Sequence, residues 1–277
     1  MAGNRITSRQ NPVIRRAAAL SRSGEERRAQ GKFLCEGARL CRDAVLSGLS
    51  VETCFYTAPA AQKYGDYLAP LLTACGESYE IEDHVAALLS STKAPQGVFC
   101  VCQVPDTLGQ AFSKAEPTLP SLLVLENLQD PGNLGTVLRT AEALGVEEVV
   151  LLGECCDPLS PKVLRASMGA VFRVGLCLER EPEKLCKLLK DHSYTLHAAV
   201  PDRGAVQITA VDFTAGKHAV FIGNEGNGLT EGTIALCHDS VTIPMGGRAE
   251  SLNASAAATI LLWEMRRGMP RKGERHG

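Results

Sequence analysis

The sequence predicts an α/β protein whose larger part is a parallel sheet covered by helices on both faces. Beyond about residue 120, apolar runs of strand length alternate with helical segments, which is typical of parallel strands joined by crossover helices. Upstream, basic helical segments alternate with similar apolar runs, which indicates a small α/β module. Between the two regions, residues 103–120 contain three prolines and few large apolar residues, so we place a domain boundary there.

The hydrophobic periodicity places the individual elements. In the first region we expect helices at residues 11–30 and 36–48 and strands at residues 51–56 and 98–102. In the second region we expect strands at residues 122–125, 149–152, 171–176, 195–200, 219–222 and 241–243. The helices between them are expected at residues 133–144, 161–169, 181–191, 230–237 and 251–267. The predicted division is therefore a domain at 1–105, a linker at 106–120 and a larger domain at 121–277.

Composition excludes several classes of protein. With 277 residues, 45% of them apolar, the chain can form one large or two ordinary domains with a sizeable core. No apolar run reaches the length of a membrane span and the N-terminus is polar, so we expect a cytoplasmic protein without a membrane partner. The eleven cysteines are scattered and mostly lie in apolar runs, which indicates reduced core residues. The pairs Cys100/Cys102 and Cys155/Cys156 lack zinc-knuckle spacing, so we expect no metal site.

The net charge of −2 hides two basic ends. Residues 1–42 carry ten Lys or Arg against three Glu, a net charge of +7, and residues 266–277 carry five against one, a net charge of +4. Such segments can be solvated helix faces and a frayed terminus, or surfaces that bind nucleic acid. If the N-terminal segment binds RNA, we expect four of its arginines to be contacts: Arg15, Arg16, Arg27 and Arg28.

In a parallel sheet, ligands bind beyond the carboxyl ends of the strands, so the loops after Leu125, Ile222 and Ile243 are the candidate site. The first loop runs through Asp130-Pro131-Gly132, a turn, to Asn133, which has the chemistry of a helix cap. Arg139 follows six residues later, where it can project near the loop from the second helical turn.

The second and third loops are rich in glycine and small residues. The glycines of residues 223–228 are spaced in the reverse of the dinucleotide-binding fingerprint, and no phosphate-binding P-loop occurs, so a Rossmann protein and a nucleotide triphosphatase are disfavoured. Glu225 lies between these glycines. The third loop runs into a helix of small side chains that Ser251 can cap, with Asn253 facing the loop.

Together the three loops resemble, in order and spacing, the motifs of the SpoU/TrmH family of RNA ribose 2′-O-methyltransferases, within the SPOUT superfamily. The matching residues are Asn133-x-Gly135-x-x-x-Arg139-Thr140, Gly223-Asn224-Glu225-Gly226-x-Gly228-Leu229, and Ile243-Pro244-Met245 with Ser251-Leu252-Asn253-x-Ser255. The N-terminal stretches 8–12 and 32–40 resemble the ribosomal-protein-like RNA substrate-binding domain that many members carry.

The resemblance implies a fold, a cofactor and an assembly. The larger domain would be a SPOUT domain, with a parallel sheet and a deep trefoil knot, a rare exception to unknotted topology. S-adenosylmethionine would bind between the second and third loops, at Gly223, Ile243, Met245, Ser251 and Leu252. The active site would lie at a homodimer interface, which would give Trp263 a role; Leu261, Leu262 and Trp263 could equally be core residues.

The resemblance also assigns the catalytic residues as Arg139, Asn133, Glu225 and Asn253. A free guanidinium loses its proton only at a pH of about 12.5–13.8, so we favour Arg139 as an orienting and phosphate-contacting group, with deprotonation by Arg139 as the alternative. The other three would hold the ribose, the phosphate and Arg139. The N-terminal domain favours ribosomal RNA as substrate, with transfer RNA, or a non-catalytic RNA-binding or ribosome-assembly role, as alternatives; a base methyltransferase is disfavoured.

Overall fold

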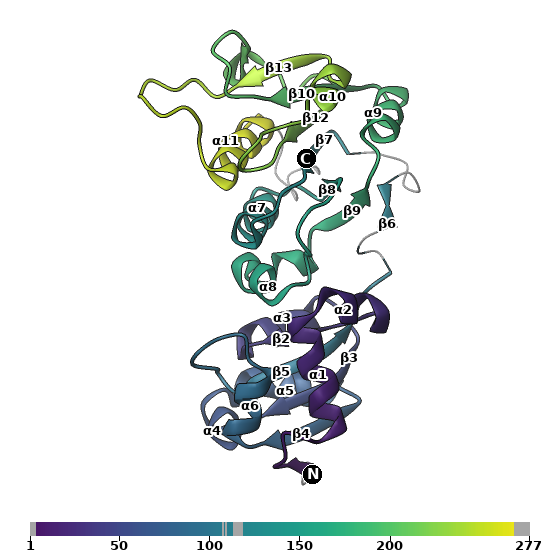
Figure 1. Cartoon of the computed structure of the whole chain (residues 1–277), viewed down its shortest axis with the longest axis vertical. Helices are drawn as coiled ribbons and strands as arrows, with labels where there is room; N and C mark the ends of the chain where they lie inside the picture. The colour runs from purple at the N-terminus through teal and green to yellow at the C-terminus, as the bar shows by residue number, and fades with distance from the viewer. Residues whose placement is uncertain (1–3, 107, 109, 113–118, 269–277) are drawn as a thin grey trace, which may run out of the picture. The chain divides into compact units, whose positions relative to one another are not determined.

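In the computed structural model of the chain, residues 4–106, 108, 110–112 and 119–268 are described, and they divide into two compact units (Figure 1). Unit 1 comprises residues 1–106 and 157–172, and unit 2 comprises residues 107–156 and 173–277. The expected linker at 106–120 lies partly outside the described residues, as does the basic tail beyond residue 268.

Unit 1 is built on a five-stranded mixed sheet with the strand order β1-β4-β3-β5-β2. Its strands are β1 (Asn4–Ile6), β2 (Lys32–Glu36), β3 (Val51–Tyr56), β4 (Glu77–Ile81) and β5 (Val98–Gln103). Its helices are α1 (Pro12–Arg22), α2 (Gly24–Gln30), α3 (Ala38–Leu46), α4 (Ala58–Lys63), α5 (Gly65–Ala74), α6 (Asp83–Leu89) and α8 (Pro161–Ser167). The core between the sheet and helices α1 and α6 contains Ile14, Leu20, Phe55, Leu89 and Phe99.

Two details of unit 1 differ from the sequence prediction. The helix expected at 11–30 is split, because Ser23 is extended and its side chain accepts a hydrogen bond from Glu26 N at 3.2 Å, which caps α2. Residues 157–172, expected in the larger domain, pack with unit 1: α8 lies on β2, and the rings of Phe33 and Phe172 are 6.0 Å apart.

Unit 2 is built on an eight-stranded sheet in which every pairing is parallel, which confirms the predicted sheet. The strand order is β11-β13-β10-β12-β7-β8-β9-β6. The strands are β6 (Gln110–Ala111), β7 (Ser121–Glu126), β8 (Glu148–Leu152), β9 (Gly175–Glu179), β10 (Tyr194–Ala199), β11 (Val206–Gln207), β12 (Lys217–Ile222) and β13 (Asp239–Thr242). All six residues of β7 are buried, as expected for a central strand covered on both faces.

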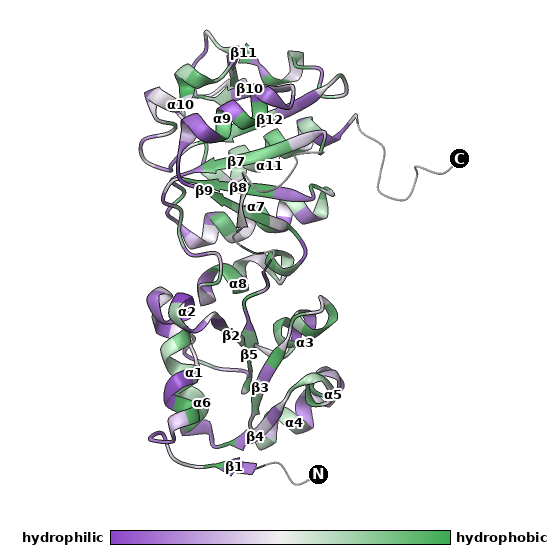
Figure 2. Ribbon diagram, turned by 90° about the vertical axis from the view of Figure 1, so that its right-hand side faces the viewer, coloured by the Kyte–Doolittle hydropathy of each residue, from purple (hydrophilic) through white to green (hydrophobic). Residues whose placement is uncertain are grey.

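Helices lie on both faces of this sheet. Figure 1 shows α7 (Pro131–Ala143) and α11 (Ala254–Arg266) on one side, and α9 (Pro182–Asp191) and α10 (Glu231–Leu236) on the other. The hydropathy colouring of Figure 2 shows that the central strands β7 and β8 are strongly apolar. One core cluster joins this sheet to α9 through Leu122, Val124, Val150, Leu185 and Leu196.

The strand expected at 171–176 is shifted. Met168 and Gly169 adopt positive φ and end α8, Ala170–Phe172 form a 3-10 turn, and β9 begins only at Gly175. The trefoil knot implied by the resemblance stays a prediction. Within the described residues, no helix is long and apolar enough to cross a membrane.

Candidate active site

The carboxyl ends of β7 and β12 place the first and second loops side by side. These strands are neighbours in the sheet, and Leu125 pairs with Ile222 at their last shared position. Strand β13, which leads into the third loop, lies two places from β12, beyond β10. Because all these strands are parallel, the three loops emerge at one edge of the sheet.

The start of α7 frees the side chain of Asn133. The helix is capped by Asp130, whose Oδ1 accepts from Asn133 N at 2.8 Å, and Pro131 occupies the first helical position. Asn133 is therefore not the cap that the sequence predicts. It lies one turn inside the helix, so its amide can contact the other loops.

Glu225 joins the second loop to the first. Its carboxylate accepts hydrogen bonds from Gln129 N at 3.2 Å, Asp130 N at 2.9 Å and Asn133 Nδ2 at 3.1 Å. Burial alone would raise the pKa of Glu225, but the hydrogen bonds from Asn133, Asp130 and Gln129 outweigh it and lower the pKa. The carboxylate is therefore ionised at neutral pH and holds the first loop against the second.

Asn253 joins the third loop to the first. Its Oδ1 caps α11 by accepting from Ser255 N at 2.9 Å, so the predicted cap by Ser251 is wrong. Its Nδ2 donates to Asn133 Oδ1 at 3.1 Å. One hydrogen-bond chain, Glu225–Asn133–Asn253, thus connects all three loops.

Gly223 closes the second loop upon itself. Asn224 and Gly228 exchange backbone hydrogen bonds of 3.0 and 2.9 Å, which brings Gly228 and Leu229 against Gly223. A Cβ atom at Gly223 would overlap backbone atoms of both residues, so only glycine fits. The sequence identified this glycine, and the packing gives the physical reason for it.

A cavity of about 350 Å³ opens between the second and third loops and the end of β10. It brings together all five residues expected to bind a cofactor: Gly223, Ile243, Met245, Ser251 and Leu252. Its remaining walls include Val200, Asn224, Glu225, Leu229, Val241 and Leu261. The volume is within the range of small-molecule sites, and the lining combines apolar side chains with exposed backbone.

Sequence reasoning missed two residues that support this arrangement. Glu126 is 1% exposed at the end of β7, and its carboxylate accepts from Thr230 N at 2.9 Å, Thr230 Oγ1 at 3.0 Å and Thr233 Oγ1 at 2.6 Å. Asn127 has φ of 52° and its carbonyl accepts from Asn224 Nδ2 at 2.8 Å. The available signal was an acid directly after the apolar run 122–125, since a buried carboxylate needs partners.

Arg139 stands apart from the hydrogen-bond chain. It is exposed on α7, makes no hydrogen bond or ion pair with any described residue, and does not line the cavity. The expectation that Asn133, Glu225 and Asn253 hold Arg139 is therefore wrong for this arrangement of the chain. Its guanidinium is free to meet a ligand from solvent.

The chain matches known families over both units. The model of the SpoU rRNA methylase family matches residues 120–263, more than half of the chain. The chain belongs to this family. The model of the MRM3-like substrate-binding domain matches residues 11–100.

Relatives of this SpoU methylase extend the match over nearly the whole chain. An uncharacterized tRNA/rRNA methyltransferase of Synechocystis is 36% identical over 95% of this chain and 93% of its own. The 23S rRNA (uridine(2479)-2′-O)-methyltransferase of Streptomyces viridochromogenes is 30% identical over 95% and 92%. The solved structure of an AdoMet-bound rRNA methyltransferase from Sinorhizobium meliloti has a TM-score of 0.84, 28% identity, and covers 97% of this chain and 99% of its own.

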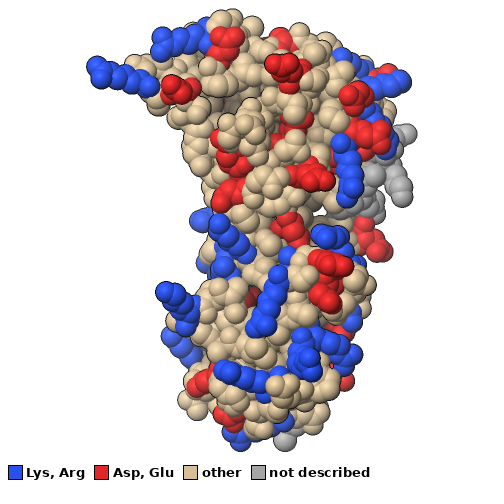
Figure 3. Space-filling view, viewed as in Figure 1, with Lys and Arg blue, Asp and Glu red and all other residues tan. Residues whose placement is uncertain are grey.

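In unit 1 of this SpoU methylase, the four arginines expected to bind RNA separate into two kinds. Arg15, Arg16 and Arg28 are exposed. Arg27 is 6% exposed, pairs with Asp157 at 2.6 Å and donates to Leu20 O at 2.6 Å, so it is a buried structural residue and the prediction for it is wrong. On the face shown in Figure 3, basic side chains are scattered over unit 1 with acidic ones between them.

All eleven cysteines are free and lie buried or half-buried, as the prediction of reduced core residues requires. The sulfur atoms of Cys35, Cys100 and Cys102 lie within 4.8 Å of one another on neighbouring strands of unit 1. Burial raises the pKa of Cys35 and Cys41, and Cys41 Sγ donates to Cys35 O at 3.6 Å, so both thiols stay protonated. The absence of a metal site stays a prediction.

Proposed function

We propose that this protein transfers a methyl group from S-adenosylmethionine to a ribose 2′-hydroxyl of ribosomal RNA. The observation that carries the proposal is the Glu225–Asn133–Asn253 chain, which ties the three family motifs around one cavity. The relatives named above support the reaction and the substrate, because their names include rRNA methyltransferases and a ribose 2′-O-methyltransferase. An activity on ribosomal RNA also favours the cytoplasm as its location.

The cavity fits S-adenosylmethionine in its size and chemistry. Its volume of about 350 Å³ suits a ligand of that size, and Gly223 leaves backbone groups of the second loop open to it. The backbone around Ile243, Met245 and Leu252, with the Ser251 side chain, would hold the polar groups of the nucleoside. When bound, the sulfonium supplies an electrophilic methyl group.

The motif residues that do not hold the cofactor have two different roles. Glu225, Asn133 and Asn253 are positioning residues, because their side chains are already hydrogen-bonded to one another or to backbone. Arg139 is the catalytic residue that contacts RNA: its guanidinium pairs with a phosphate and stabilises the charge that develops on the 2′-oxygen. Arg139 acts as a hydrogen-bond donor, so the proton that the 2′-hydroxyl loses passes to the solvent to which this residue is exposed.

We also propose that two copies of this chain form the working enzyme. Leu261 and Leu262 are buried, whereas Ala256, Ile260 and Trp263 form an exposed stripe on α11, with Trp263 56% exposed. Such a stripe is a typical core for an interface between copies. Trp263→Asp should therefore yield monomers without activity, measured by light scattering and methyl transfer, with Leu72→Asp as a control at an exposed apolar residue of unit 1. Fully active monomers would contradict the dimer.

The test of the proposed activity compares the wild-type protein with Arg139→Ala. Labelled S-adenosylmethionine is offered with total ribosomal RNA, transfer RNA and intact ribosomal subunits from cells that lack this protein. We expect the wild type to label ribosomal RNA at one alkali-resistant linkage, and Arg139→Ala to bind the cofactor normally but lose the transfer. Arg180→Ala, an exposed arginine of unit 2, is the control. Label in a base, or none with any RNA, would refute the proposal.

A further inference from the structure

A second cavity lies wholly within unit 1. Its volume is about 380 Å³, and it opens between α3, the loop after α6 and α8. Its lining includes Arg39, Leu40, Gln96, Leu164, Arg165 and Met168. The proposed reaction does not use this cavity. Its lining places cationic arginine side chains beside apolar leucine and methionine side chains.

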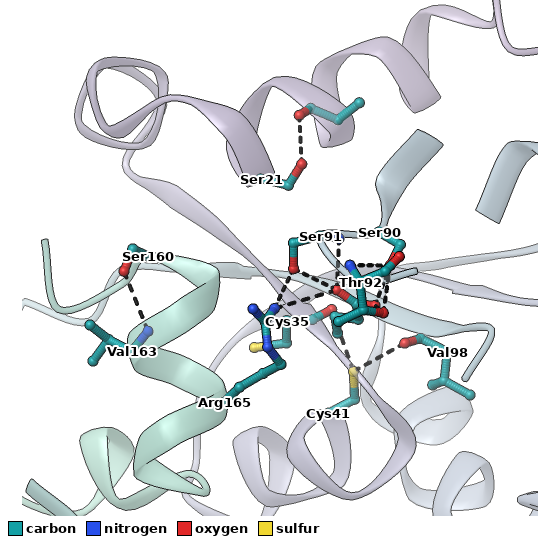
Figure 4. Close-up of polar contacts among 12 residues, drawn as sticks. Ser21, Cys35, Cys41, Ser90, Ser91, Thr92, Val98, Ser160, Val163 and Arg165 are labelled. Carbon is teal, nitrogen blue, oxygen red and sulfur yellow. Dashed lines mark hydrogen bonds and ion pairs between the residues drawn. The ribbon is translucent and has the colours of Figure 1, made fainter. Parts of the chain in front are cut away.

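Arg165 is held in place at the mouth of this cavity. Its Nη1 donates to Ser91 Oγ and lies 3.8 Å from Glu36 Oε2, as Figure 4 shows for Arg165 and Ser91. Glu36, whose side chain is 8% exposed, attracts the guanidinium, while Ser91 fixes its direction. An arginine held in this way loses little freedom when it binds a ligand.

Glu36 does not use up the donors of Arg165. Its two carboxylate oxygens accept from Ser90 Oγ, Ser91 N at 3.0 Å, Ser91 Oγ at 2.8 Å and Thr92 Oγ1 at 2.8 Å, which fills their acceptor positions. At 3.8 Å, Arg165 is too far away to form a hydrogen bond with Glu36. No described residue accepts from the remaining N–H groups of Arg165, nor from the exposed Arg39 guanidinium.

The floor of the cavity is apolar and partly open to solvent. Leu40 and Leu164 are buried, whereas Met168 is 42% exposed although it lines the cavity. Met168 also has a backbone φ of 51°, which is uncommon for residues other than glycine, asparagine and aspartate. Gln96 Oε1 accepts from Ala38 N at 3.0 Å, which fixes the amide at the cavity wall and leaves its NH₂ group for a ligand. Asp43 adds a carboxylate to the lining.

We propose that this cavity holds one nucleotide of single-stranded RNA, with a phosphate on Arg165 and Arg39 and the base against Leu40, Leu164 and Met168. Two guanidinium groups with unused N–H donors beside an apolar floor match the anionic and flat parts of a nucleotide. Bases of unpaired RNA can turn out of the chain into such a pocket, whereas paired bases cannot. The inference rests on the proposed function, which makes RNA the substrate, and it assigns RNA contacts outside the basic helices α1 and α2.

Binding of RNA by the full-length protein tests this without methyl transfer. Fluorescence anisotropy is measured with a labelled 12-nucleotide single strand and with the same sequence as a duplex. We expect Arg165→Gln to weaken single-strand binding about tenfold, since one charge-assisted contact is lost, and to leave duplex binding and cofactor binding unchanged. Arg180→Gln is the matched control and should bind both RNAs as the wild type does.

A second variant separates the pocket from the Ser91–Glu36 network. Met168→Asn tolerates the positive φ and removes the apolar contact, so it should also weaken single-strand binding without lowering the melting temperature. A single strand carrying 4-thiouridine should crosslink to the peptide after Arg165, which contains Met168.

The assignment is overturned if both variants bind the single strand as the wild type does, or if the crosslinks map only to α1. It is also overturned if Arg165→Gln weakens the binding of free AMP but not the binding of RNA, because the ligand would then be a mononucleotide. If Arg165-dependent RNA binding is present but no RNA is methylated, the pocket stands and the proposed reaction fails.

Discussion

The two units place their functional arginines differently. In unit 2, Arg139 is exposed and free, beside loops that one hydrogen-bond chain joins. In unit 1, Arg27, which the charge count places among the RNA contacts, is buried against Asp157 and Leu20 O. The motifs after the strands therefore identified Asn133, Glu225 and Asn253 correctly as neighbours, whereas a count of charges could not say which charges face solvent.

The difference has a physical origin. The motif residues of unit 2 are constrained by backbone: glycine where a Cβ has no room, caps at helix starts, and carboxylates that accept main-chain N–H groups. Each such constraint acts over a few residues and leaves a local pattern. Whether an arginine on a basic helix is buried depends on a residue 130 positions away, and no local pattern records that.

The largest effect is expected at Gly223. Gly223→Ala would force the added Cβ into the backbone of Gly228 and Leu229, so the second loop must open. We expect cofactor binding and methyl transfer to fall more than a hundredfold, measured by calorimetry and by label transfer. Gly232→Ala is the matched control, since nothing lies within 4 Å of that position, and it should behave as the wild type does. Normal cofactor binding by Gly223→Ala would show that the loop does not form the pocket.

A smaller loss is expected at Glu225. Glu225→Gln keeps the shape but replaces one acceptor oxygen with an NH₂ group, which faces Gln129 N, Asp130 N or Asn133 Nδ2. We expect a fall of about tenfold to a hundredfold in kcat with cofactor affinity little changed, measured by steady-state kinetics. Glu250→Gln, an exposed acid of the third loop, is the control.

The same carboxylate predicts a pH dependence. Because the pKa of Glu225 is lowered in the folded protein, the stability it adds is present above the ordinary value of 4.5 and is lost as the pH falls through the lowered value. Thermal unfolding followed from pH 7 to pH 3 should therefore show an acid-induced loss in the wild type that is smaller in Glu225→Gln. Equal losses in the two proteins would assign the acid sensitivity to other groups.

Much of the fold was predictable because its periodicity is local. The strands of unit 2 alternate with helices along the chain, and their parallel pairing follows from that alternation. The exceptions are instructive: the apolar residues 171–176 match a strand in composition, but Met168 and Gly169 turn the chain so that Val171 packs in a 3-10 turn. Likewise, Asn133 has the chemistry of a helix cap, yet Asp130 three residues earlier takes that role and releases Asn133 to join the loops.

A fourth prediction tests the buried arginine directly. Arg27→Gln removes the ion pair to Asp157 and leaves that carboxylate, together with Leu20 O, without its partner. We expect the free energy of unfolding to fall by about 3 kcal/mol, measured by urea denaturation, because breaking a buried pair leaves an uncompensated charge. Arg28→Gln, on the same helix but exposed, should cost little. A stable Arg27→Gln variant with weakened RNA binding would restore Arg27 to the RNA surface.

The smallest effect is expected from two exposed arginines of α1, Arg15 and Arg16. The double variant Arg15→Gln/Arg16→Gln removes two charges that no described residue pairs with, so the melting temperature should stay unchanged. Each lost phosphate contact should lower the slope of log affinity against log salt by about 0.7 to 0.9, so RNA binding becomes weaker and less dependent on salt. The measurement is RNA affinity between 50 and 300 mM salt. An unchanged slope would show that Arg15 and Arg16 contact no phosphate, and it would leave the cavity beside Arg165 as the RNA contact proposed for unit 1.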